Sequence, residues 1–95
     1  MSAYIIADIE ILDQRAYDEY RSKVPAIIAA HGGRYLVRGG AHEVLEGTWR
    51  PGRHVVIEFP TMTALRAFYD SAEYRQLRAL RERAARSSIV AFEGA

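Results

Sequence analysis

The 95-residue sequence contains no cysteine, carries no large excess of charge and has no apolar run long enough to cross a membrane. The absence of cysteine excludes a disulfide framework, a thiolate nucleophile and a cysteine-based metal site. The formal net charge of only +1 argues against a dedicated binder of nucleic acid. Acidic residues at positions 8, 10 and 13 interrupt the first apolar stretch, so we expect no signal peptide and a cytoplasmic location.

The composition is that of an ordered domain, with 49% hydrophobic and 26% charged residues. We interpret residues 1–95 as a single domain with one small core. A domain of this size buries only about two-thirds of the surface that its unfolded chain exposes, so a second association surface would stabilise it.

The first half of the sequence predicts a strand, a helix and a second strand. Residues 3–11 alternate between apolar and mixed positions, as in a half-buried strand. Asp13 is the expected N-cap of a helix that runs to about Ala30, and Pro25 inside it predicts a kink or a split at about Lys23. The second strand covers residues 34–38, residues 39–40 (Gly-Gly) predict a bend or bulge, and residues 43–46 are a candidate continuation of the strand.

The second half repeats this order. Residues 47–53 predict a hairpin loop, and residues 54–59 predict a third strand that Pro60 ends. Thr61 or Thr63 is expected to cap a helix, and Ser71 a further helix. Ser87 or Ser88 should open the last strand, which Gly94 ends. The expected inward-facing residues of the two helices are Met62, Leu65, Phe68 and Tyr69, then Tyr74, Leu77, Leu80 and Ala84.

Two such halves around a central hairpin predict an α+β, ferredoxin-like βαββαβ fold: a four-stranded antiparallel sheet with its helices on one face. The other sheet face should be polar if it met water. Alternation instead assigns to it a mixture of apolar and charged residues, namely Tyr4, Ile6, Leu36 and Val56 with Asp8, Arg38 and Glu58. Such a face predicts burial against a second copy of the chain, in a homodimer.

Four segments resemble the DUF1330 family. They are residues 32–40 (GGRYLVRGG), 55–60 (VVIEFP), 69–74 (YDSAEY) and 89–94 (IVAFEG), and together they span most of the chain. Ala72 departs from the family, which usually has proline there at the start of a helix. The resemblance implies a dimeric α+β barrel, in which two ferredoxin-like sheets pack face to face. Its superfamily includes small monooxygenases, muconolactone isomerase-like proteins, dehydratases and stress-responsive barrels, whereas DUF1330 itself has no assigned reaction, so the resemblance implies no particular function.

The first candidate site consists of Asp8, Arg38 and Glu58. If the third strand lies between the first and the second, Glu58 would neighbour both other residues on the outer face. Two carboxylates beside a guanidinium can give one carboxyl the raised pKa that a general acid or base needs. The alternative is a charge network that fixes sheet register and dimer geometry.

The other candidates are a histidine and a set of aromatic residues. His54 could transfer a proton or simply pack at a strand end, and no two of His31, His42 and His54 have metal-ligand spacing, so we expect no metal site. Tyrosines could orient a small ligand in a cleft between sheet and helices, as in relatives that hold aromatic substrates, or simply form the core. The candidate ligand-binding residues are Tyr17, Tyr35, Tyr69 and Trp49.

Six arginines crowd the second helical region, at positions 66, 75, 78, 81, 83 and 86. Because acidic residues are interspersed among them, we expect a solvated helix face and no nucleic-acid partner. No phosphate-binding glycine motif is present, and no cofactor is expected. Two interpretations of function remain: a cofactor-free enzyme or binder of a small aromatic or carbonyl-bearing molecule, and a non-catalytic dimeric module whose charged strand residues serve assembly.

Overall fold

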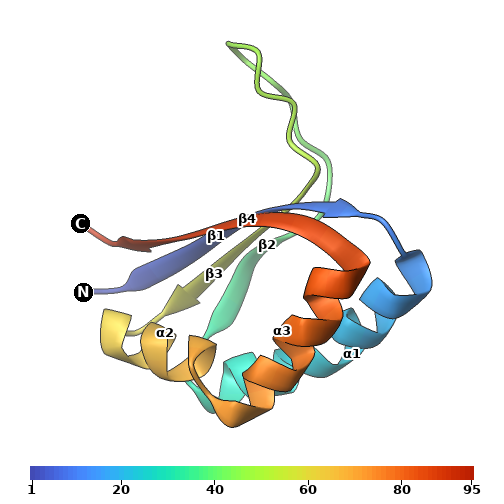
Figure 1. The fold of residues 1–95 in the computed structure, drawn as a ribbon. Coiled ribbons are helices and arrows are strands. Elements are labelled where there is room, and N and C mark those ends of the chain that lie inside the picture. Colours follow the sequence, from blue (N-terminus) through green and yellow to red (C-terminus); the bar gives the residue numbers. More distant parts are fainter.

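The computed structural model describes all 95 residues, and the predicted βαββαβ order is correct. Figure 1 shows one sheet with every helix on the same side of it. The elements in chain order are β1 (Ala3–Ile11), α1 (Gln14–Ala30), β2 (Arg34–Arg38), β3 (Arg53–Phe59), α2 (Met62–Tyr69), α3 (Ala72–Ala84) and β4 (Ala85–Glu93).

The sheet is antiparallel with strand order β2-β3-β1-β4, so β3 lies between β1 and β2 as expected. The alternation of β1 is confirmed: Ala3, Ile5, Ala7 and Ile9 are buried toward the helices. The last strand begins at Ala85, earlier than Ser87 or Ser88, because β1 extends to Ile11 and Ile11 pairs with Ala85.

Side-chain caps start all the helices at expected positions. Asp13, Thr61 and Ser71 each accept a hydrogen bond from the backbone amide three residues later. Thr61, not Thr63, is therefore the cap of α2.

The expected split of α1 at about Lys23 is wrong. The helix runs through Pro25 without interruption. Proline removes the donor that would bond the carbonyl four residues earlier, which belongs to Arg21. The guanidinium of Arg38 donates to that carbonyl at 3.1 Å instead. Burial of Val24 and Ile28 on either side of Pro25 holds the helix against the sheet.

A β-bulge interrupts β2 where no bulge was expected. Tyr35 pairs with Ile57, but Val37 pairs with Val56 and Arg38 with Val55, so Leu36 is the extra residue. One extra residue reverses the alternation beyond it. Arg38 therefore turns to the helix face of the sheet, and the prediction that it lies on the outer face is wrong.

Residues 39–52 form a long arm that projects away from the helices (Figure 1). Residues 43–46 do not continue the strand, so that expectation is wrong too. The positive φ of Gly39 and Gly40 lets the chain leave the sheet, and Gly39 still bonds the His54 carbonyl through its amide. Asp8 fixes the return of the arm, because its carboxylate accepts from the indole of Trp49 at 2.9 Å and from the amide of Gly52 at 2.8 Å.

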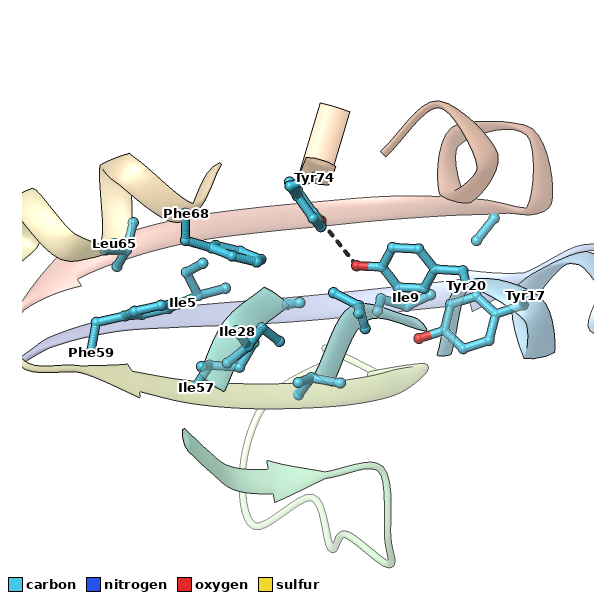
Figure 2. Close-up of a cluster of buried hydrophobic side chains, with 14 of the residues drawn as sticks. Ile5, Ile9, Tyr17, Tyr20, Ile28, Ile57, Phe59, Leu65, Phe68 and Tyr74 are labelled. Carbon is cyan, nitrogen blue, oxygen red and sulfur yellow. Dashed lines mark hydrogen bonds between the residues drawn. The ribbon is translucent and has the colours of Figure 1, made fainter. Parts of the chain in front are cut away.

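The core lies between the sheet and the helices. Figure 2 shows aromatic rings of α1, α2 and α3 facing the strand residues. Phe68 packs against both Phe59 and Tyr74, with ring centroids 5.3 Å and 4.4 Å apart. Burying such rings contributes most of the apolar stabilisation of a small domain.

The outer sheet face carries an apolar row that crosses all four strands. Val37 pairs with Val56, Val56 with Ile6, and Ile6 with Val90. Ile6 is 40% exposed and Val90 49% exposed, and Phe92 in the neighbouring row is 50% exposed. A monomer rarely leaves a continuous apolar row of this kind in water.

Candidate functional site

A narrow cavity lies within the layer between the sheet and the helices. Its volume is about 40 Å³, and most of its lining is apolar or aromatic. Tyr17 and Tyr20 of α1, Tyr35 of β2, and Tyr69 and Tyr74 at the helices opposite contribute to the wall. The three predicted tyrosines, Tyr17, Tyr35 and Tyr69, therefore do line one space.

The deepest polar groups of this cavity form a hydrogen-bonded chain. The hydroxyls of Tyr20 and Tyr74 are 2.9 Å apart (Figure 2), and Arg81 donates to the Tyr74 oxygen at 2.8 Å. Burial raises the pKa of Tyr20 and the pKa of Tyr74 above their ordinary values, because an ionised phenolate would lose its hydration. Both tyrosines are therefore neutral donors at neutral pH.

Arg81 is buried, which overturns its expected place on a solvated helix face. It is only 5% exposed, and its Nε has no hydrogen-bond partner. Helical spacing explains this position, because Arg81 follows the buried Tyr74 by seven residues, which is two turns along the same face of α3. That spacing was the available signal in the sequence.

Arg38 reaches the cavity from β2. Its guanidinium lies over the ring of Tyr35, 4.6 Å from the centroid, and donates to the Arg21 carbonyl that Pro25 leaves free. The bulge and the helical proline together set this position: the first turns the side chain inward and the second supplies its acceptor.

Arg53, at the start of β3, was not among the predicted site residues. It pairs with Ile9 and continues the inward alternation of Val55 and Ile57, which was the signal for it. Its Nε is buried without a partner, and its guanidinium lies 5.8 Å from the centroid of Tyr17.

The arginines connect the cavity to a surface depression. This depression has a volume of about 450 Å³ and shares Arg21, Arg38 and Arg53 with the cavity. Its one carboxylate, Asp18, lies 3.6 Å from Arg21 and accepts from Gln14 at 2.8 Å. The combined site can hold a small group inside and a larger, polar part outside.

The predicted group of Asp8, Arg38 and Glu58 does not assemble. Tyr4 pairs with Glu58 and Asp8 with His54, so the two carboxylates are four residues apart along the sheet, or about 13 Å. Arg38 lies on the opposite face from both of them because of the bulge.

The surroundings of Glu58 lower its pKa, whereas the predicted role of general acid or base needs a raised pKa. Arg34 contacts its carboxylate at 2.7 Å, and the Tyr4 hydroxyl donates to it at 3.2 Å. The pKa of Glu58 lies below its ordinary value, and the largest cause is the hydrogen bond from Arg34. Glu58 is therefore an ionised member of a network on the outer face.

Two other candidates also lie outside the cavity. His54 is on the outer face, where its ring meets that of His42 with centroids 5.0 Å apart. Trp49 is 63% exposed on the arm, and both residues border a groove of about 410 Å³ between the arm and the sheet. The prediction that Trp49 joins the tyrosines is wrong. No cluster of three or more His, Asp or Glu side chains is arranged to hold a metal ion.

The sheet order, the one-sided helices and the cavity between them define a ferredoxin-like α+β protein. The family model described as Domain of unknown function (DUF1330) matches residues 2–95. The chain belongs to that family, and the resemblance seen in its sequence is confirmed.

Solved structures share this fold at low sequence identity. The RPA0582 protein of unknown function from Rhodopseudomonas palustris has a TM-score of 0.80 at 16% identity, over 99% of this chain and 82% of that one. A dimeric ferredoxin-like protein of unknown function from Jannaschia sp. CCS1 has a TM-score of 0.67 at 15% identity, over 99% and 100%. SnoaB, a cofactor-independent oxygenase from Streptomyces nogalater, has a TM-score of 0.66 at 10% identity, over 99% and 93%.

No curated protein matches the chain. None of its helices combines the length and the apolar character that a membrane crossing requires.

Proposed function

We propose that this protein is a homodimeric, cofactor-free enzyme or binder that holds a small carbonyl-bearing or aromatic molecule between its sheet and its helices. The observation that carries the proposal is the tyrosine-lined cavity that Arg38 reaches. Tyrosine hydroxyls and guanidinium groups are the donors that orient a carbonyl oxygen and stabilise negative charge on it. The cofactor-independent oxygenase among the structural neighbours is compatible with chemistry of this kind on this fold.

The size of the site limits how such a ligand binds. A cavity of about 40 Å³ has room for about three water molecules, or a few non-hydrogen atoms. Only a small end of the ligand enters it, and the remainder occupies the depression beside Arg38 and Arg53.

A cavity-filling substitution tests this site. Ala7 is buried on the cavity wall, so Ala7→Val adds two methyl groups there. In a thermal-shift screen of small aromatic acids, aldehydes and ketones, we expect some compounds to raise the melting temperature of the wild type. Ala7→Val should abolish that shift and Arg38→Ala should reduce it, whereas Ala79→Val, exposed on α3, should retain it. Equal shifts in wild type and Ala7→Val, or no shift with any compound, would contradict the proposal.

The dimer is supported by the apolar row on the outer face and by the dimeric structural neighbour. Association through this row would remove Ile6 and Phe92 from water. We expect Ile6→Lys to weaken self-association by about tenfold or more, whereas Leu12→Lys, off the sheet face, should not change it. Sedimentation velocity measures this, and a wild type that stays monomeric at micromolar concentration would refute the dimer.

Glu58 fits the alternative interpretation, in which charged strand residues form a network that serves assembly of the dimer. It is ionised, bonded to Arg34 and Tyr4, and lies beside the apolar row. We therefore assign Glu58 to assembly and Arg38 to the ligand. Glu58→Gln should weaken the dimer and leave ligand binding intact, and the reverse result would overturn this division.

A further inference from the structure

The cavity and its mouth contain more positive charge than the surrounding protein neutralises. Four guanidinium groups line them, from Arg21, Arg38, Arg53 and Arg81, against the single carboxylate of Asp18. Asp18 already pairs with Arg21. Arg38, Arg53 and Arg81 take part in no salt bridge, although the whole chain has a net charge of only +1.

Arg81 is the most costly of these charges to bury. It is 95% removed from solvent and donates to the neutral oxygen of Tyr74, while its Nε has no partner. An ionised group in such a place requires a counter-charge to offset its lost hydration. The neighbouring tyrosines cannot supply it, because burial raises the pKa of both Tyr20 and Tyr74.

Arg53 repeats the pattern nearer the surface. Its Nε is also buried without a partner, and its guanidinium packs against Gly39, where any side chain would collide with it. Arg53 is therefore a further cation of this site that has no salt-bridge partner.

We propose that the counter-charge comes from the ligand, and that this site takes a small organic molecule bearing a carboxylate. This inference rests on the proposed function, since it uses the same cavity. A planar carboxylate matches the planar donor fork of arginine. As the small end of the ligand, it also fits the narrow cavity better than a bulkier tetrahedral phosphate, and the rings of Tyr35 and Tyr17, which lie against Arg38 and Arg53 at the mouth, can contact the attached carbon skeleton.

The experiment compares acids with their neutral amides, which have nearly the same shape. Titration calorimetry of the full-length protein with benzoate and benzamide, and with salicylate and salicylamide, isolates the contribution of charge. We expect the wild type to bind each acid about tenfold or more tightly than its amide. The preference should fall toward unity in Arg81→Met and decrease in Arg53→Gln. It should persist in Arg75→Gln, which alters an exposed arginine of α3 that forms no ion pair.

A second readout separates ligand binding from a purely structural role. If Arg81 awaits an anion, replacing it with methionine removes an unbalanced buried charge, so the ligand-free melting temperature should stay the same or rise. A lower melting temperature together with an unchanged acid preference would mean that Arg81 only supports the fold, and would overturn the inference. Arg53→Gln gives an independent test if Arg81→Met does not fold.

The remaining outcomes distinguish the two proposals. Acids and amides that bind equally, and lose binding together in Ala7→Val, would refute the carboxylate preference but leave the proposed function intact. Failure of both classes to bind would refute the proposed function, and the carboxylate site with it.

Discussion

Tyr74 should matter more to stability than Tyr20, although their hydroxyls bond each other. The Tyr74 oxygen is hydrogen-bonded to both Tyr20 and Arg81, whereas the Tyr20 hydroxyl is hydrogen-bonded only to Tyr74. Tyr20→Phe removes one neutral hydrogen bond, worth about 1 kcal/mol. Tyr74→Phe removes that bond and also a charge-assisted bond worth about 1.5–3 kcal/mol, and leaves the buried guanidinium without its acceptor. We expect losses of about 1 kcal/mol for Tyr20→Phe and about 3 kcal/mol for Tyr74→Phe.

Urea unfolding at a fixed protomer concentration measures this difference, provided that the slope of the transition is unchanged. For a domain of this size, 1 kcal/mol corresponds to about 4–8 °C in melting temperature. Both substitutions keep the ring and its packing, so each serves as the packing control for the other. Equal losses would refute the view that Tyr74 is the main acceptor for Arg81.

Three further predictions concern other parts of the chain. Because Arg34 lowers the pKa of Glu58, the ionised Glu58 carboxylate stabilises the fold at pH values above its ordinary pKa. This stabilisation is lost as the pH falls through the lower pKa that Glu58 has in the folded state. Below about pH 4.5, the melting temperature of Glu58→Gln should therefore fall less steeply than that of the wild type. Pro25→Ala should raise the free energy of unfolding by about 1–2 kcal/mol, measured by urea unfolding. An interior proline costs a helix about 3 kcal/mol, and the stabilisation it gives by restricting the unfolded chain is smaller. A lower free energy of unfolding would contradict this prediction. Asp8→Ala should accelerate hydrogen exchange at the Gly52 amide by about tenfold or more, but not at Gly39, whose amide bonds the His54 carbonyl.

The architecture could be predicted because its signals are local. The alternation of residues 3–11, and the caps Asp13 and Ser71, fix where elements begin and which side faces the core. The order of these elements then leaves few topologies, and the ferredoxin-like one is the observed one.

The site could be predicted only in part because its side-chain directions depend on one irregularity. Nothing in the segment from Tyr35 to Arg38 signals a bulge, and the glycines that suggested one follow it. Simple alternation therefore assigned Arg38 to the wrong face.

Residue charge gives the wrong expectation of burial at two other positions. Residue type groups Arg81 with the exposed arginines, although its helical spacing from Tyr74 places it in the core. Residue type likewise assigns Arg53 to the surface, since a charged residue at a strand start is usually exposed. Buried cations beside a cavity are an exception to composition rules, and the spacing of the residues is the better guide.

The extra residue in β2 also determines how relatives of this protein should be aligned. Deleting Leu36 would remove the bulge and leave Val37 outside and Arg38 inside, but pairing the same residues without a bulge would put Leu36 opposite Val56, Arg38 on the outer face and Val37 toward the cavity. Gain or loss of the bulge at constant length could thus transfer a cation from the cavity to the outer sheet face while the amino acids stay the same. An alignment without a gap at this point would equate arginines that face opposite sides of the sheet, so functional residues should be transferred between family members only after their strand pairing has been compared.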